Sequence, residues 1–519
     1  MQYMSNQGKS SVREDGNKKV NRGGSERTSS ETAVISLGSR FLAFVGHTMF
    51  IGRFGTGNPL LNAFTFALLL PNVIFSVLGT ALTAVMIPIY NSLRAEEKHD
   101  DAKKFIDNVI SISIVILAIL VTVGLIAAPW ISAVSGDSEH REYLTFALRV
   151  LIPMMIFFGF GAIFQGLLQS HGVFRLPAFV SAPGGIFLIL YMVFLSEYFG
   201  VTGLIFATAV GIFSQPLIMI RAVRRLGYRY KFSLDLKNEH IRTAGKLCIP
   251  VLISAASYQM HFFFGHTIAL RLGTTAIMNY AQQLVLVFIL TIVYAIAAVY
   301  FPKLSTLWAK ADSHEYNETL RNALLYTMFL VLPAAAGFFL LRFEIMDFLL
   351  NWRDGGELVD VQMAGNLMGL YAVAVIAISF KEVTDRAFYS VKDSKTPAIF
   401  GVVIMAVNII GTLLLIPALG AYAMPVAYGI AAITGSGGLV LKLQNRTGFI
   451  NFTFALEMAK TSLAVAAMFL AAILMRNAQF TEIGVLNLFA PAVTGVMVYF
   501  IMAFVLKISA LRALGAVKK

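Results

Sequence analysis

The sequence predicts an all-α polytopic membrane protein with fourteen transmembrane helices, arranged as two six-helix lobes and two further C-terminal helices. Of its 519 residues, 57% are hydrophobic and only 13% are charged, whereas a soluble globular protein carries about 25% charged residues. The apolar residues gather in long runs, and a helix needs about 20 of them to cross a bilayer. The basic residues stand between these runs, so the net charge of +13 indicates membrane orientation and not nucleic-acid binding.

The N-terminal segment, residues 1–32, is polar, rich in Ser, Gly, Lys and Arg, and has no hydrophobic period. We therefore expect a disordered cytoplasmic tail. It does not resemble a signal peptide, because the first apolar stretch begins near Ala33, contains Arg40 and lacks a small-residue cleavage site.

Fourteen apolar segments follow the tail, and each predicts one transmembrane helix. They cover residues 33–53, 60–91, 106–134, 143–169, 176–197, 200–220, 247–270, 276–302, 320–341, 360–380, 396–416, 421–441, 455–475 and 484–506. The predicted domains are an N-lobe (33–223), a basic cytoplasmic loop (224–246), a C-lobe (247–443) and the last two helices with the C-terminal tail (444–519).

The basic residues fall mostly on one side when the predicted spans alternate. Of the 41 Lys and Arg residues, six lie in the outer loops and Arg40 and Arg149 lie within spans, so 33 collect on the side of the tail. Cytoplasmic loops are enriched in Lys and Arg. We therefore expect an even number of spans with both termini in the cytoplasm.

Short sequences recur at a nearly constant offset, which indicates an internal duplication. The sequence RFGT at 53–56 returns as RLGT at 271–274, an offset of 218. Ser170, Arg175, Pro177 and Ala178 are matched 220 residues later by Ser390, Lys395, Pro397 and Ala398. A unit of six spans keeps its orientation when it is duplicated, and some transporters bind their substrate between two such parallel repeats.

Several of these segments resemble the MurJ/MviN lipid II flippases, a family of the MOP exporter superfamily. The resemblance lies in Ser39-Arg40, residues 53–55, Pro71-Asn72, Pro88, Leu148-Arg149 with Pro153, residues 168–179, Tyr280-Ala281 through Pro302 and, most clearly, the segment from Arg386 to Pro397. It spans nearly the whole chain after the tail. It implies a flippase of the bacterial cytoplasmic membrane that moves a polyprenyl-diphosphate-linked sugar precursor, most simply lipid II for peptidoglycan, to the outer leaflet by alternating access.

The chain departs from the family at several charged positions. Gly46 and His47 stand where the family has an Arg-Asp pair, and Asn62 stands where it has Asp. Neutral residues also replace family charges at Phe75, Ser76, Thr80, Gln283 and Leu286. The resemblance implies that those charges hold the diphosphate. Another lipid-linked glycan, such as an exopolysaccharide unit, therefore stays open as the cargo.

A flippase forms no covalent bond, so we expect no catalytic residue, metal site or cofactor, and the lone Cys248 has no disulfide partner in the chain. Polar groups inside spans are costly in lipid and usually face a cavity or a partner helix. The candidate substrate cavity consists of Ser39, Arg40, His47, Arg53, Asn62, Asn72, Ser76, His261, Gln282 and Gln283.

Each candidate also has a structural interpretation. Arg40 can reach lipid phosphates at the cytoplasmic end of its span, and His47 and His261 can be packing groups. Asn72 and Ser76 belong to a stripe of small polar residues that serves either a wet cavity or helix packing. Gln282 and Gln283 can hold helices together, and Arg53 can anchor the chain at the interface.

Two further readings of the function stay open. An ion-coupled drug exporter is disfavoured because the first span has no carboxylate, and a non-transporting membrane scaffold remains the alternative from another class. The expected partners are the lipid-linked glycan and membrane lipids, with cell-wall synthesis proteins as candidates and no nucleic acid. We expect the protein to act as a monomer.

Overall fold

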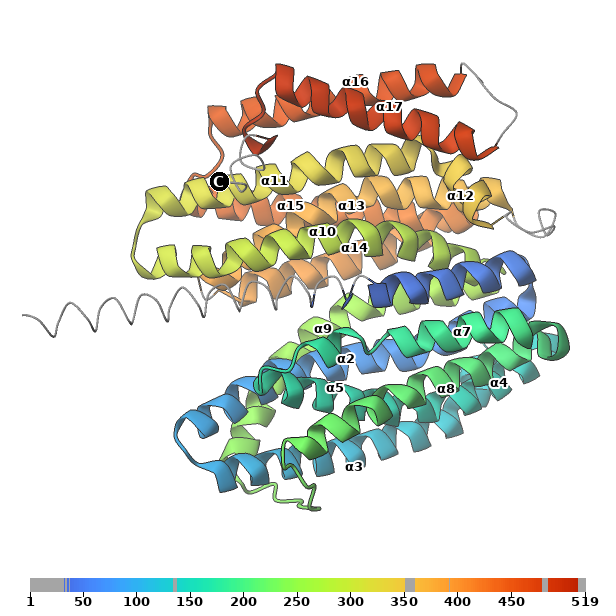
Figure 1. Cartoon of the computed structure of the whole chain (residues 1–519), viewed down its shortest axis with the longest axis vertical. Helices are drawn as coiled ribbons and strands as arrows, with labels where there is room; N and C mark the ends of the chain where they lie inside the picture. The colour runs from blue at the N-terminus through green and yellow to red at the C-terminus, as the bar shows by residue number, and fades with distance from the viewer. Residues whose placement is uncertain are drawn as a thin grey trace, which may run out of the picture. The chain divides into compact units, whose positions relative to one another are not determined.

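A computed structural model describes residues 32, 35, 36, 38–133, 138–350, 360–391, 393–477 and 484–511. In these ranges every regular element is a helix, as predicted (Figure 1). The predicted tail up to residue 31, the last eight residues and Arg353 lie outside the described residues.

The first helix covers residues 38–54. The labelled elements follow as α2 (Pro59–Ala95), α3 (His99–Ser132), α4 (Ser138–Leu151), η2 (Ile152–Met154), α5 (Met155–Ser170), α6 (Arg175–Ala178), α7 (Ala182–Phe194), α8 (Ser196–Arg225), α9 (Glu239–Arg271), α10 (Thr275–Ala309), α11 (Ser313–Leu340), α12 (Arg342–Leu350), α13 (Val361–Ser390), α14 (Lys395–Leu419), η4 (Gly420–Tyr422), α15 (Ala423–Thr447), α16 (Phe452–Asn477) and α17 (Gly484–Val505).

Eleven stretches of the described chain are long and apolar enough to cross a membrane. One of them, Lys395–Thr447, contains both α14 and α15, which the sequence predicts as two spans. The first helix and α9 are not among the eleven. The polytopic helical class is therefore confirmed, whereas the count of fourteen spans stays a prediction.

The described residues divide into two compact units. The first unit takes the residues up to Met49, Ile74–Pro129 and Thr145–Leu252, and the second takes Phe50–Val73, Trp130–Leu144 and the chain from Ile253 onward. The boundary between the units at residue 252 lies inside α9.

The core of the first unit lies where α3, α5 and α8 meet the C-terminal part of α2. Phe105, Ile106, Leu167 and Met219 are at most 1% exposed there. Helices α7 and α8 approach closely at Gly211, where a Cβ atom would lie 2.9 Å from the Cα of Gly184. Small residues allow such approach between membrane helices.

In the second unit, α10, α11, α13, α14 and α15 pack together, and α16 with α17 lies beside α11 (Figure 1). The Tyr499 hydroxyl donates to the backbone carbonyl of Phe329 at 2.6 Å, and the two rings lie 5.2 Å apart. This contact fastens the last predicted span to the ninth.

The turns of the chain repeat as the sequence predicts. The N–H of Val173 donates to the carbonyl of Leu168 at 2.9 Å, and 220 residues later the N–H of Asp393 donates to the carbonyl of Phe388 at 3.0 Å. Positive-φ glycines recur as well, at Gly55 with Gly273, Gly200 with Gly420 and Gly227 with Gly448. Glycine adopts this left-handed backbone without a Cβ clash, so corresponding helices in the two halves end in the same way.

Candidate functional site

Asn62 is buried in α2 and links two backbone turns of the second unit. Its Nδ2 donates to the carbonyl of Gly273 at 2.8 Å and to that of Asn58 at 3.2 Å. Its Oδ1 accepts a hydrogen bond from the N–H of Ala276 in the first turn of α10, also at 2.8 Å. Only 1% of the Asn62 surface is exposed, and both ends of its amide form hydrogen bonds with backbone groups.

Gln283 belongs to a chain of polar groups that extends from α10 to α9. Its Nε2 donates to Oδ1 of Asn279 at 2.9 Å, and Nδ2 of Asn279 lies 3.1 Å from Nε2 of His266. The Gln283 side chain is exposed, whereas the adjacent Gln282 is buried. Exposed amides of this kind donate to and accept from sugar hydroxyls.

His261 lies in an aromatic cluster. It is 3% exposed, and its ring stacks on Tyr428 with a centroid distance of 5.4 Å and an interplanar angle of 13°. Phe262 and Tyr371 contact the same tyrosine ring at 5.6 Å and 6.2 Å. This setting favours packing over substrate contact for His261.

The other predicted cavity residues differ in exposure. Ser39 is buried and donates to the carbonyl of Ile35 at 2.8 Å. His47 and Ser76 are half-buried, and Arg40, Arg53 and Asn72 are exposed. The exposed members are therefore the ones that an external head group can reach.

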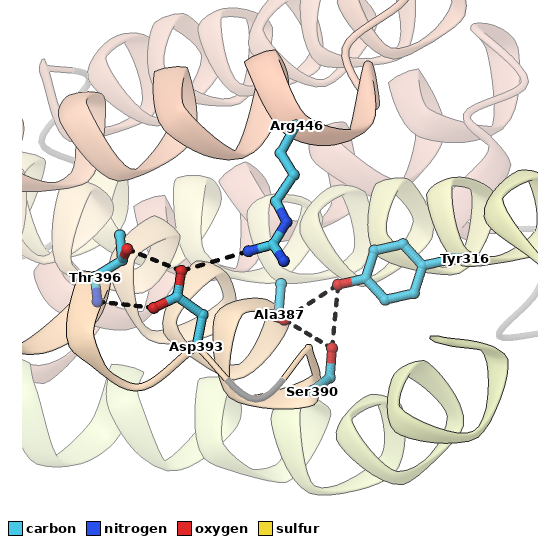
Figure 2. Close-up of polar contacts among 6 residues, drawn as sticks. All are labelled: Tyr316, Ala387, Ser390, Asp393, Thr396 and Arg446. Atoms are coloured by element: carbon cyan, nitrogen blue, oxygen red, sulfur yellow. Dashed lines mark hydrogen bonds and ion pairs between the residues drawn. The ribbon is translucent and has the colours of Figure 1, made fainter. Parts of the chain in front are cut away.

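The segment that carries the clearest family resemblance forms a polar clamp at the junction of α13 and α14 (Figure 2). The Tyr316 hydroxyl of α11 donates to the carbonyl of Ala387 at 3.1 Å and lies 3.1 Å from Oγ of Ser390. Both contacts connect α11 to the end of α13.

Asp393 forms the other half of this clamp. Its carboxylate accepts from the N–H of Thr396 at 3.1 Å and from the Thr396 hydroxyl at 2.9 Å, and Arg446 of α15 lies 3.4 Å away. Partial burial acts to raise the pKa of Asp393, but the Thr396 hydrogen bonds and the charge of Arg446 leave that pKa below its ordinary value. The clamp therefore joins four helices, α11, α13, α14 and α15.

Two charged side chains pair near the end of α13. Lys381 Nζ lies 2.5 Å from Oδ2 of Asp385, one turn along α13, and both side chains are nearly buried. Among the described residues, no group of three His, Cys, Asp or Glu side chains is placed to hold a metal ion.

Sequence reasoning did not identify a second polar cluster, on α3. The side chains of Asp107, Asn108 and Ser111 are buried and hydrogen-bond to residues 228–235. The sequence offers a weak signal: these polar residues interrupt the apolar run of the third span.

Comparison with known proteins identifies relatives along almost the entire chain. Residues 53–495 match the family model described as lipid II flippase MurJ. The lipid II flippase MurJ of Burkholderia cenocepacia is 24% identical over 427 residues, which cover 79% of this chain and 82% of that protein. The probable lipid II flippase MurJ of Bdellovibrio bacteriovorus is 25% identical over 461 residues, with 86% and 88% covered.

Solved structures show the same fold. A lipid II flippase MurJ in an inward closed conformation superposes with a TM-score of 0.78 at 20% identity, covering 91% of this chain and 98% of that one. An inward-facing multidrug resistance MATE transporter of the MOP superfamily follows with a TM-score of 0.62 at 18% identity, covering 80% and 98%.

Proposed function

Because the lipid II flippase MurJ family model matches residues 53–495, this chain belongs to that family, and we propose that it moves lipid II from the inner to the outer leaflet of the bacterial inner membrane. That match, across most of the chain, is the observation that carries the proposal. The family consists of transporters, so the prediction that the chain is not an enzyme is confirmed. Movement of lipid II supplies peptidoglycan synthesis outside the membrane.

The head group of lipid II carries a diphosphate and sugars, so its carrier needs cationic and hydrogen-bonding groups. Arg40, Asn72 and Gln283 supply a guanidinium and two amides on exposed side chains. Guanidinium binds phosphate oxygens through paired hydrogen bonds, and the amides bind hydroxyls. We assign the head group to these three residues, with alternating access between the two six-helix lobes.

The orientation and assembly belong to the same proposal. Both termini lie in the cytoplasm, because most basic residues then face the cytoplasm. The protein acts as a monomer, and cell-wall synthesis proteins are its candidate partners.

Complementation tests this function. The full chain is expressed in a bacterium whose own lipid II flippase is depleted, with an empty vector as the control. We expect growth and normal cell shape, and we expect the purified protein to move lipid II across vesicles. The alternative outcome has two parts. The protein is abundant in the membrane but does not rescue growth, and it does rescue a strain that lacks an exopolysaccharide flippase. That outcome would assign the chain to an exopolysaccharide unit as its cargo.

A further inference from the structure

The first unit contains a cavity of about 660 Å³ at the basic end of α8, a volume typical of small-molecule sites, which span about 300–1,000 Å³. Its interior is apolar and is built from three helices. The apolar lining residues are Ile110 and Ile114 of α3, Phe160 and Phe164 of α5, and Ile220 and Val223 of α8.

Charged and aromatic side chains complete the lining. Arg224, at the end of α8, and Arg229, in the loop that follows, contribute two guanidinium groups. Both side chains are exposed, and within the described ranges neither guanidinium is in an ion pair or hydrogen bond. The cavity therefore joins an apolar interior to two uncompensated positive charges.

The wall that carries Arg229 is held in place by buried polar groups of α3. We call residues 228–235 the strap. The Tyr228 hydroxyl donates to Oδ1 of Asp107 at 2.5 Å, and the N–H of Lys231 donates to the same oxygen at 3.2 Å. The Tyr230 hydroxyl lies 2.9 Å from Oγ of Ser111. Asp107 is 4% exposed and does not line the cavity.

Two more contacts extend the attachment along the strap. Oδ1 of Asn108 accepts hydrogen bonds from the Ser233 hydroxyl at 3.1 Å and from the N–H of Asp235 at 2.7 Å. Burial and the Asp107 carboxylate raise the pKa of Tyr228, so its hydroxyl remains a donor. A strap fixed at this many points presents a preformed site, which reduces the ordering cost of binding.

The sequence beside the cavity changes from apolar to basic. The apolar run of α8 ends at Ile220, and Arg221, Arg224 and Arg225 follow directly. Such a boundary marks the membrane interface, and basic pockets between helices on the cytoplasmic side bind anionic lipid head groups.

We propose that this cavity binds an anionic phospholipid, with the phosphate between Arg224 and Arg229 and one acyl chain among the isoleucines and phenylalanines. The site lies wholly within the first unit, and none of its lining residues is a predicted substrate residue. The phosphate chemistry alone would also suit a free anion. The apolar lining favours a phosphate that carries a chain.

The experiment compares lipid retention by the full chain. Protein is reconstituted with equal amounts of phosphatidylglycerol and phosphatidylcholine, and native mass spectrometry records which lipid stays bound. We expect preferential retention of phosphatidylglycerol. The double variant Arg224→Ala/Arg229→Ala should bind it at least about tenfold more weakly, since charge-assisted hydrogen bonds to the phosphate are lost.

Arg221→Ala/Arg225→Ala is the matched control. It removes the same number of positive charges, from the end of α8, but neither residue lines the cavity, so we expect full retention. Equal loss in the two double variants would overturn the proposal by showing only general attraction to a basic surface.

A second variant tests the apolar part of the site separately from the charges. Ile114→Trp narrows the apolar part of the cavity and keeps both arginines, so it should also weaken retention, and unchanged retention would overturn the proposal. Inorganic phosphate and glycerol phosphate are offered alone as competitors. Displacement of phosphatidylglycerol by either competitor at low millimolar concentration would mean that the cavity does not recognise the acyl chain of the lipid. That result would overturn the lipid assignment.

Discussion

The side-chain amide of Asn62 donates a hydrogen bond to the backbone carbonyl of Gly273 across 2.8 Å. Gly273 belongs to the RLGT turn that repeats the RFGT turn at 53–56, and Asn62 lies in the first part of the helix that follows that earlier turn. The contact therefore joins the start of α2 to the turn between α9 and α10, within the second unit. Asn62 stands at a position where the resemblance implies an Asp, and in this chain its amide holds two backbone turns together.

Replacing Asn62 should destabilise the protein. Asn62→Ala leaves the Gly273 carbonyl and the Ala276 N–H without their partner, at an expected cost of about 1–3 kcal/mol. Asn62→Asp should also destabilise, because a carboxylate accepts from Ala276 but cannot donate to Gly273. Thermal unfolding in detergent measures both variants. Asn72→Ala removes an exposed amide from the same helix and serves as the control, and equal melting temperatures for Asn62→Ala and this control would refute the prediction.

The clamp at Asp393 should make stability depend on pH. Its pKa is depressed in the folded protein, so the carboxylate stabilises the fold above the unfolded pKa, which is about 3.9, and that stabilisation is lost as the pH falls through the folded value. Asp393→Asn should therefore be less stable than wild type at pH 7, and the difference should shrink below about pH 4.

Melting temperatures of wild type and Asp393→Asn at pH 7 and below about pH 4 measure the effect of Asp393. Thr396→Val removes the hydroxyl that bonds to the carboxylate and should reduce the pH dependence only in part. A constant difference between wild type and Asp393→Asn across the range would contradict the prediction.

Local patterns explain why the helical class could be predicted. The apolar runs and the distribution of basic residues can be recognised from the composition of each segment alone. The RFGT and RLGT turns are similar in sequence because both need a left-handed glycine. Gly200 and Gly420 also adopt the left-handed backbone. The sequence does not predict this, since a single glycine inside an apolar run resembles a packing residue.

The polar clusters could not be predicted for a different reason. Asp107 contacts Tyr228, 121 residues away in the chain, and no local period encodes that pairing. Asn62 illustrates the same limit. An asparagine inside a span requires hydrogen-bond partners, but the Gly273 carbonyl that accepts from it lies 211 residues further along the chain.

Arg40, Asn72 and Gln283 should affect transport more than stability. Their side chains are exposed, so Arg40→Ala, Asn72→Ala and Gln283→Ala should each slow lipid II movement in vesicles while the protein remains abundant and folded. Arg221→Ala, which removes an exposed charge at the end of α8 outside the proposed site, gives a comparison for charge loss alone. Wild-type rates in all three variants would remove these residues from the proposed site.

The topology is tested by labelling single cysteines. Cys248 is replaced by Ser, and one new cysteine is placed after Lys519. We expect an impermeant maleimide to label this cysteine only after cell lysis, since both termini are assigned to the cytoplasm. A cysteine at Thr274, in a turn that the same topology assigns to the outer side, should be labelled in intact cells. Labelling of the C-terminal cysteine without lysis would refute the even number of spans.

The last prediction concerns the energy source. The diphosphate of the proposed cargo carries roughly two negative charges, and an inside-negative potential drives each of them outward with about 2.3 kcal/mol per 100 mV. Two charges would therefore gain about 4–5 kcal/mol if no counter-ion travels with them. That gain is enough to bias the step without a coupled proton.

Transport should therefore follow membrane potential and tolerate loss of the three histidines near the middle of the spans, His47, His261 and His266. Flipping is measured in vesicles in which the potential and the pH gradient are set separately. Gln replaces each histidine and keeps hydrogen-bonding groups at the site. For His261 the melting temperature is measured in parallel, since its stacking on Tyr428 makes a loss of stability expected there. Activity that follows the pH gradient alone, and disappears in a folded His47→Gln or His266→Gln protein, would instead identify proton coupling through a histidine.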